Sequence, residues 1–184
     1  GLQGYPVPAR SVKVIDLASG RIIREIRSVP SPNSTTFDPT GARLAITSWE
    51  VPTTVVDLAS GDVAFALDEV LLYPVMDTAW SPDGQSIATA GFDGGVRVFD
   101  GGTGHQRFSI HGTGGHAFAV DWSPDCRLVV AGKSDGTARV WIVNEGGARE
   151  VITLSAHDTR KGIEGVAFSP DGTRVLTGDL GVTA

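Results

Sequence analysis

The stretch that decides the fold is residues 80–100, WSPDGQSIATAGFDGGVRVFD. Two runs of β-favouring residues, 86–90 and 96–100, follow the tryptophan and are separated by turn residues. Ser-Pro-Asp-Gly at 81–84 places proline where φ near −65° is wanted and glycine where positive φ is wanted, so it predicts a tight hairpin. The carboxylate of Asp100 can accept backbone N–H groups of the next turn, as in an Asx-turn. This stretch therefore predicts short antiparallel strands.

The same pattern occurs four times along the chain. The leading aromatics stand 43, 42 and 46 residues apart, at Phe37, Trp80, Trp122 and Phe168. We name four strands per repeat: a ends on this aromatic, and b, c and d follow it. The predicted b strands are 43–47, 86–90, 127–131 and 174–178; the c strands are 12–16, 53–57, 96–100 and 138–142; the d strands are 22–26, 63–67, 106–110 and 150–154. Because the repeat fills the chain, we expect a single all-β segment over residues 1–184.

The repeats divide that segment into three complete units and two halves. Strands c and d lie in residues 1–28, complete units cover 29–68, 69–111 and 112–155, and strands a and b lie in 156–184. From the strand-a aromatic to the end of strand c the spacing is constant, from 37 to 57, 80 to 100 and 122 to 142. Length varies only in the d–a connections and in one c–d turn. Since variable loops on a rigid scaffold usually carry binding, we expect function in the d–a loops.

Composition narrows the function classes. The net charge is −6, with scattered Lys and Arg, which argues against nucleic acid as a partner. No apolar run approaches the ~18–20 residues needed to span a bilayer, so we expect no membrane partner. Cys126 cannot form an internal disulfide, and no signal peptide is visible at the start. These features fit a reducing compartment, and we expect a cytoplasmic location.

The repeat resembles the WD40 family of β-propellers. The resemblance rests on the period, the four strands per unit, and the segments FSPDG at 168–172, DGTARVW at 135–141 and DGGVRVFD at 93–100. It implies a WD40-like propeller of about four four-stranded antiparallel blades, three complete and two halves, and a role in protein–protein contacts. The literal closing Trp-Asp pair of the family is absent. A TolB-like propeller is the alternative, because AWSPDGQSIATAG at 79–91 would fit it as well.

The family also implies a structural hydrogen-bonded tetrad of His, Ser or Thr, Asp and Trp. The third complete repeat comes nearest to it, with Asp135, Trp141 and either His111 or His116, although Ala131 cannot hydrogen-bond. Three further sets follow from the residues themselves. Asp93 and Asp135 precede glycines and are predicted turn formers, Asp57 and Asp100 close strand c, and His111 and His157 each stand eleven residues before a strand-a aromatic. Equal spacing favours a structural role for these two histidines.

Three arrangements of the half-units are possible. The chain could close as a four-bladed ring, two chains could form an eight-bladed ring, or the segment could belong to a longer propeller. We expect the last, with self-association through unclosed blade edges as a possible homo-oligomer. The strand-a aromatics are expected in the core between blades.

The candidate binding face consists of the d–a and b–c loops, which leave the same end of the blades. Trp49, Phe92 and Lys133 are predicted to take matching b–c positions as interaction residues, with His111, His116 and His157 beside them. We see no HExxH, GxSxG or CxxC motif, and predict no catalytic residue, metal site or cofactor. The sequence therefore indicates a protein-interaction scaffold or sensor, as a regulatory segment of a larger protein, and not an enzyme. The alternative is a TolB-like or hydrolase-type propeller acting on a small ligand near the central channel.

Overall fold

The computed structural model describes residues 11–70, 72–111, 115–155, 157 and 161–179. Within these ranges all regular structure is β. The strands are β1 Val12–Ile15, β2 Ile22–Ile26, β3 Pro32–Phe37, β4 Arg43–Ser48, β5 Thr54–Asp57, β6 Val63–Ala66, β7 Val75–Trp80, β8 Ser86–Gly91, β9 Gly95–Asp100, β10 Gln106–His111, β11 Ala117–Trp122, β12 Leu128–Lys133, β13 Thr137–Asn144, β14 Gly147–Ser155, β15 Ile163–Phe168 and β16 Val175–Asp179. No helix in the described ranges is long and apolar enough to cross a membrane.

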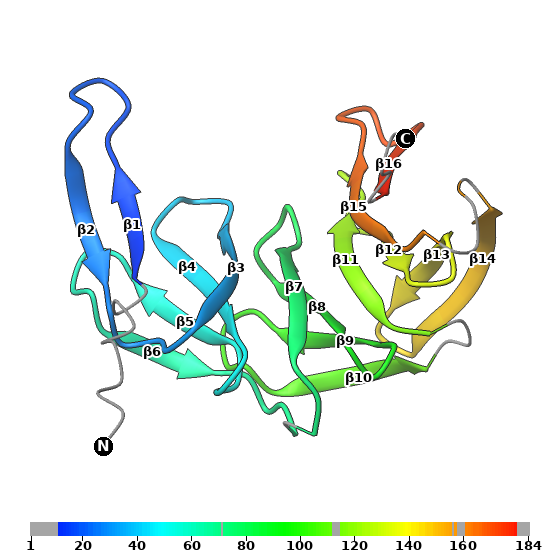
Figure 1. The fold of residues 1–184 in the computed structure, drawn as a ribbon, viewed down its shortest axis with the longest axis horizontal. Helices are drawn as coiled ribbons and strands as arrows, with labels where there is room; N and C mark the ends of the chain where they lie inside the picture. The colour runs from blue at the N-terminus through cyan, green and yellow to red at the C-terminus, as the bar shows by residue number, and fades with distance from the viewer. Residues whose placement is uncertain (1–10, 71, 112–114, 156, 158–160, 180–184) are drawn as a thin grey trace, which may run out of the picture.

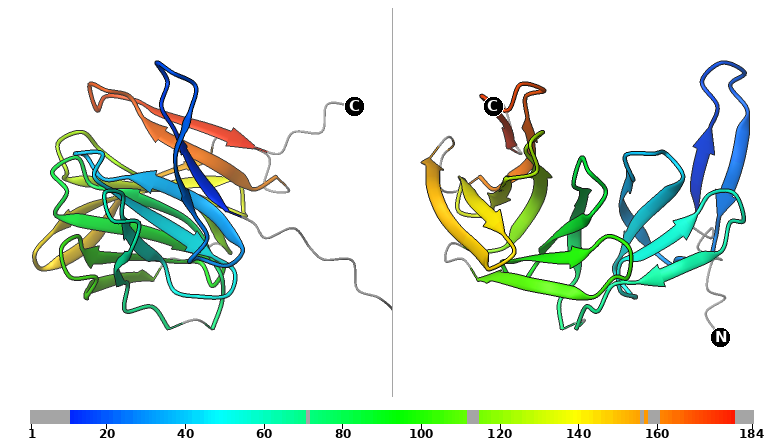
Figure 2. Two further views of the ribbon diagram at one scale, coloured as in Figure 1. Left: turned by 90° about the vertical axis from the view of Figure 1, so that its left-hand side faces the viewer. Right: turned by 180° about the vertical axis from the view of Figure 1, so that it is seen from behind.

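The strands form the predicted blades. Three four-stranded antiparallel sheets have the orders β3-β4-β5-β6, β7-β8-β9-β10 and β11-β12-β13-β14, flanked by the two-stranded sheets β1-β2 and β15-β16. The prediction of three complete blades and two halves is thereby confirmed. Figure 1 shows the sheets arranged as an open arc, with β1-β2 at one end and β15-β16 at the other. The views in Figure 2 show the same separation of the two half-blades.

The hairpins between strands a and b have the backbone that their sequence demands. Gly41, Gly84 and Gly172 have φ of 72°, 72° and 68°, and Cys126, which replaces the glycine in its repeat, has φ of 60°. A side chain in this left-handed region is strained. Burial raises the pKa of the Cys126 thiol, which favours its protonated form. Cys126 is therefore a substituted turn residue.

The apolar core lies between neighbouring blades. Trp80, for example, packs with Ala45 and Val55 of the preceding blade, and Trp80 and Trp122 are 7% and 6% exposed. The expectation of a buried strand-a aromatic is wrong for Phe37, which is 51% exposed. The reason is that the neighbouring sheet β1-β2 has no strands a and b. Its apolar residues, such as Val14, pack against β4 and β5, and so they leave Phe37 uncovered.

Carboxylates on the inner strands join one blade to the next. On β7, Asp77 accepts hydrogen bonds from Ser34 Oγ in the preceding blade, at 2.6 Å, and from the N–H of Val120 in the following blade, at 3.0 Å. On β11, Asp121 accepts the N–H of Phe168 at 2.7 Å. Burial raises the pKa of both carboxyl groups. Four successive sheets are thus linked through two aspartates.

Candidate protein-interaction face

A b–c loop and a d–a loop of the second complete blade meet at Phe92. Phe92 directly follows β8, and its N–H donates to the carbonyl oxygen of Pro74 at 2.9 Å. This bond joins the b–c loop of the β7–β10 blade to the d–a loop that leads into the same blade. The structure therefore brings together loops of the two classes that the sequence singled out.

An aromatic cluster crosses the boundary between these two blades. The rings of Phe92 and His116 are stacked, with centroids 3.7 Å apart and planes at 14°, and Phe118 lies 6.4 Å and 5.9 Å from them. His116 Nδ1 is hydrogen-bonded to the carbonyl oxygen of Phe92. The backbone N–H of His116 donates to Ser134 Oγ, and the N–H of Ser134 donates to the carbonyl oxygen of His116, each at 2.9 Å. These bonds hold the imidazole against Phe92.

Lys133 does not take the role predicted from its sequence position. It pairs with Ala117 across the hairpin, as Gly91 pairs with Val75, so Ser134 and not Lys133 is the equivalent of Phe92. Its side chain is fully buried, and Nζ donates to the carbonyl oxygen of Gly94 at 2.6 Å. Burial lowers the pKa of the ammonium group. Lys133 therefore holds the b–c turn at Gly94 and cannot itself present a charge to a partner.

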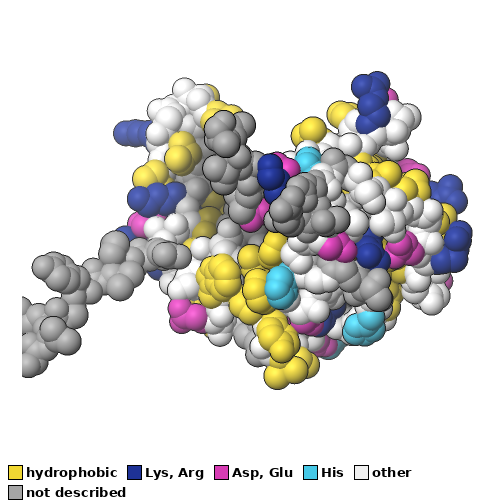
Figure 3. Space-filling model, turned by 45° about the vertical axis from the view of Figure 1, so that its right-hand side comes forward, with side chains coloured by type: hydrophobic (Ala, Val, Ile, Leu, Met, Phe, Trp, Pro, Cys, Tyr) yellow, Lys and Arg dark blue, Asp and Glu magenta, His cyan; other side chains and the backbone are white. Residues whose placement is uncertain are grey.

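Exposed apolar side chains extend the surface beside Phe92. In the d–a loop, Val70, Leu72 and Tyr73 are 79%, 79% and 56% exposed, and Trp49 of the preceding b–c loop is 48% exposed. In Figure 3 hydrophobic side chains gather next to histidine on one face of the molecule. Exposed apolar patches of this kind mark interaction sites in soluble proteins. We call Val70, Leu72, Tyr73, Phe92 and His116 the apolar face.

The candidate structural aspartates bond to nearby turn groups. Asp57 Oδ1 accepts the N–H of Ser60 at 2.8 Å, and Asp100 Oδ1 accepts those of Gly102 and Thr103 at 3.0 Å and 2.9 Å. The Arg107 guanidinium holds the pKa of Asp100 well below its usual range.

The b–c turns use aspartate in the same way. Asp93 Oδ1 accepts the N–H of Gly95, and Asp135 Oδ1 accepts that of Thr137, each at 3.0 Å. Trp141 is buried in the core between blades. These positions shape turns and packing.

A hydrogen-bonded set of the kind implied by the family occurs in the last repeat. His157 Nδ1 lies 3.0 Å from Asp179 Oδ2, and Nε2 lies 2.8 Å from Thr177 Oγ1. Sequence reasoning looked for this set in the third complete repeat and missed Thr177, although the nine-residue step from the strand-a aromatic would have found it. His111, with the same spacing as His157, is exposed at the end of β10.

Glu69 takes the place of this histidine in another repeat, and sequence reasoning missed it. It stands eleven residues before Trp80, and its Oε2 accepts the N–H of Thr53 at 2.7 Å. Burial raises the pKa of Glu69, although the hydrogen bond from the N–H of Thr53 acts in the opposite direction. A carboxylate therefore joins the start of the d–a loop to the neighbouring strand of its own blade.

The described ranges contain no group of three or more His, Cys, Asp or Glu side chains suited to a metal ion. What they contain is a set of four-stranded antiparallel blades with an apolar loop face. This architecture defines a β-propeller segment.

Comparison with known proteins identifies the family. The family model described as "WD domain, G-beta repeat" matches residues 72–100, 104–141 and 148–181, which is more than half of the chain. The chain therefore belongs to the WD40 repeat family, and this match decides against the TolB-like alternative.

Curated relatives carry the same repeats. Transducin beta-like protein 3 of Bos taurus is 28% identical over 170 residues, which cover 90% of this chain and 21% of that protein. WD repeat-containing protein 1 of Bos taurus is 32% identical over 81 residues, 42% of this chain and 13% of that protein. WD repeat-containing protein 90 of Mus musculus is 33% identical over 111 residues, 57% of this chain and 6% of that protein. The chain thus spans a small part of each of these relatives.

Proposed function

We propose that this chain is a protein-interaction module of a larger regulatory protein and that it binds its partner through the apolar face. The observation that carries the proposal is the Phe92–His116 stack at the joint of two blades, next to exposed side chains of the d–a loop. Aromatic anchors in a rigid setting, surrounded by apolar contacts, are typical of interaction hot spots. The names of the three relatives describe no enzymatic activity, which supports a binding role.

The rigidity of the face supports the proposal further. His116 is fixed by its ring and backbone hydrogen bonds. The carbonyl oxygen of Gly94 in the b–c turn accepts a hydrogen bond from the buried ammonium group of Lys133. A pre-organised surface loses little conformational entropy when a partner binds. Trp49, in the adjacent b–c loop, extends the proposed contact area.

The test compares two substitutions in the apolar face with one control substitution elsewhere, in affinity capture from cell lysate with quantitative mass spectrometry. Leu72→Ser and Phe92→Ala alter the apolar face, and Ile152→Ser, on the outer strand β14, removes a half-exposed apolar side chain elsewhere. We expect a specific set of proteins to bind the native chain and the Ile152→Ser variant. The amount of these proteins captured by the two face variants should be lower by about tenfold or more. Equal capture by all variants would show that the apolar face is not the binding site.

Two accompanying proposals concern assembly and location. Exposed Phe37, on β3, and exposed Leu176, on the end sheet β15-β16, favour self-association. Light scattering should give a mass above that of one chain, which Phe37→Ser with Leu176→Ser should reduce. A monomeric mass for the native chain would contradict this. A cytoplasmic location is consistent with the single free thiol of Cys126, and fractionation of cells that contain the protein tests it.

A further inference from the structure

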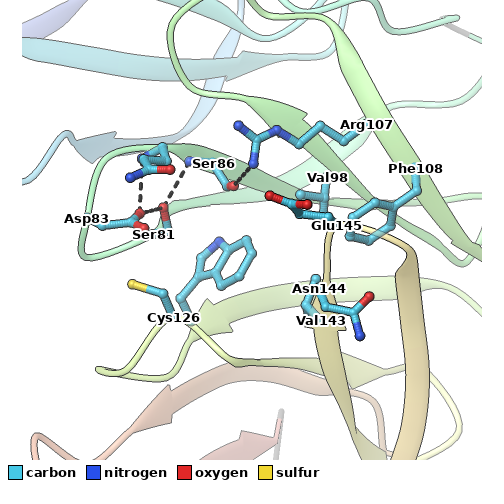
Figure 4. Close-up of a pocket in the computed structure, with 12 residues that line it drawn as sticks. Ser81, Asp83, Ser86, Val98, Arg107, Phe108, Cys126, Val143, Asn144 and Glu145 are labelled. Carbon is cyan, nitrogen blue, oxygen red and sulfur yellow. Dashed lines mark hydrogen bonds between the residues drawn. The ribbon is translucent and has the colours of Figure 1, made fainter.

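A cavity of about 510 Å³ lies between the β7–β10 blade and the β11–β14 blade. It opens among the a–b and c–d turns, at the opposite end of the strands from the apolar face. Figure 4 shows Arg107 and Phe108 of the β7–β10 blade and Asn144 and Glu145 of the β11–β14 blade among the side chains that line the cavity. Trp122 and Cys126 also line it.

The preceding pair of blades shows what fills the equivalent space there. The Arg43 guanidinium lies over the Trp80 ring, 4.7 Å from its centroid, and Nη1 donates to the carbonyl oxygen of Gly101 at 3.0 Å. Nε of Arg43 donates to Asp38 Oδ2 at 3.2 Å. One arginine thus combines a cation–π contact, a backbone hydrogen bond and an ion pair at a blade boundary.

The strand register identifies the matching positions one blade further on. Arg43 pairs with Asp57, as Ser86 pairs with Asp100 in the next blade. Ser86 therefore replaces Arg43, and Trp122 replaces Trp80. Because serine is too short to reach the indole, the arginine contact of the first boundary has no counterpart at the second, where the cavity is lined in part by the 6% exposed Trp122.

The neighbouring Arg107 does not act as Arg43 does. Its Nη1 donates to Ser86 Oγ at 3.1 Å and its Nη2 to Asp100 Oδ2 at 2.7 Å, so its charge is paired on its own blade. The carboxylates of Asp83 and Glu145 also line the cavity. The lining therefore offers an indole and two further acidic groups to a cation.

We propose that this cavity binds an arginine side chain of a partner protein, with its guanidinium over Trp122 as that of Arg43 lies over Trp80. This would be a second recognition site, independent of the apolar face. Its ligand class is an arginine-bearing peptide segment, because the planar guanidinium both stacks on an aromatic ring and forms forked hydrogen bonds with carboxylates.

The direct test is an NMR titration of the 184-residue chain with a blocked pentapeptide that carries one arginine between glycines. The indole N–H signal of Trp122, assigned with Trp122→Phe, reports on binding. A pentapeptide with citrulline in place of arginine is the control, since it keeps the shape and loses the charge. We expect the arginine peptide to shift this signal saturably and the citrulline peptide to bind about tenfold more weakly. Equal responses to the two peptides, or no response to either, would overturn the proposal.

A pair of variants tests the location. Strand register makes Ala64 the equivalent of Arg107, since each lies between the two residues that pair with strand c. The double variant Ser86→Arg with Arg107→Ala therefore gives this blade the residues of the preceding one and should abolish the response while the fold is kept. Arg107→Ala alone leaves the cavity open and should bind the peptide at least as well as the native chain. Binding by a folded double variant equal to that of Arg107→Ala would refute the site. Leu72→Ser should leave the titration unchanged, which separates this proposal from that of the apolar face.

Discussion

Replacing Gly94 with alanine should loosen the apolar face and destabilise the chain more than the same change in an open turn. Gly94 has φ of 83°, and a Cβ added there would overlap the carbonyl oxygen of Gly115, next to His116. The matched control is Gly41→Ala, because Gly41 has φ of 72° and a Cβ there would meet nothing within 4 Å. Both variants impose left-handed strain, and one of them adds the overlap.

The expected magnitudes follow from these two contributions. Left-handed alanine costs about 1–2 kcal/mol, which is the whole effect at Gly41. Relief of the overlap at Gly94 must move backbone on one side or the other, which adds about 1–3 kcal/mol. We therefore expect a loss of about 2–5 kcal/mol in the free energy of unfolding for Gly94→Ala and about 1–2 kcal/mol for Gly41→Ala.

Urea unfolding followed by tryptophan fluorescence measures both losses, and capture of partners measures the functional effect. Gly94→Ala should also weaken partner binding, since movement of Gly115 displaces His116 from Phe92, whereas Gly41→Ala should not. If the two variants lose equal stability and bind equally well, the close approach of Gly94 to Gly115 is not what positions the apolar face.

Four further substitutions test the buried charge, the packing and the turn strain. Because the pKa of Glu69 is raised in the folded state, the folded native chain binds more protons than the unfolded chain and loses stability as pH rises from about 4.5. Glu69→Gln lacks this titration, so its stability relative to the native chain should increase over the same pH range. A pH-independent difference in urea unfolding would contradict this. Ile163→Ala, at a fully buried position, should lower the free energy of unfolding by about 2–5 kcal/mol. Leu176→Ala, at a 72% exposed position, should lower it by less than about 0.5 kcal/mol. Equal losses in the same assay would refute the assigned packing. Cys126→Gly should raise stability by up to about 1 kcal/mol by removing left-handed strain, and a lower melting temperature in calorimetry would show that thiol packing outweighs it.

The repeat was predictable because its anchors are local. Ser-Pro-Asp-Gly and the aromatic before it require only a hairpin, and the four strands follow from period-two patterns between turns. The substitution of Cys126 for glycine could be predicted for the same reason. Blade number and strand order needed nothing beyond this short-range chemistry.

The errors concern contacts between blades. The burial of Lys133 depends on the carbonyl oxygen of Gly94, thirty-nine residues away along the chain, and lysine is ordinarily exposed. The exposure of Phe37 depends on what the neighbouring sheet supplies. The misplacement of Lys133 among the b–c positions, by contrast, was avoidable, because Phe92 stands twelve residues after Trp80 and Ser134 stands twelve after Trp122.

The candidate site was predictable only in part. The spacing of the histidines pointed to the d–a loops, and the aromatic at position 92 pointed to a b–c loop. The stacking of His116 on Phe92 depends on how two blades meet, which no single repeat encodes. The cavity over Trp122 likewise becomes visible only when the register aligns Ser86 with Arg43.

The hydrogen bonds of Asp77 bear on how the chain responds to mechanical force. Repeat arrays with weak contacts between units unravel one unit at a time, because each unit is held mainly by its own strands. Here the carboxylate of Asp77 joins β7 to β3 and to β11, so removal of the β7–β10 blade breaks a hydrogen bond to each of its two neighbours. Pulling on the chain should therefore release neighbouring blades in one large extension, and Asp77→Ala should divide that extension into smaller steps.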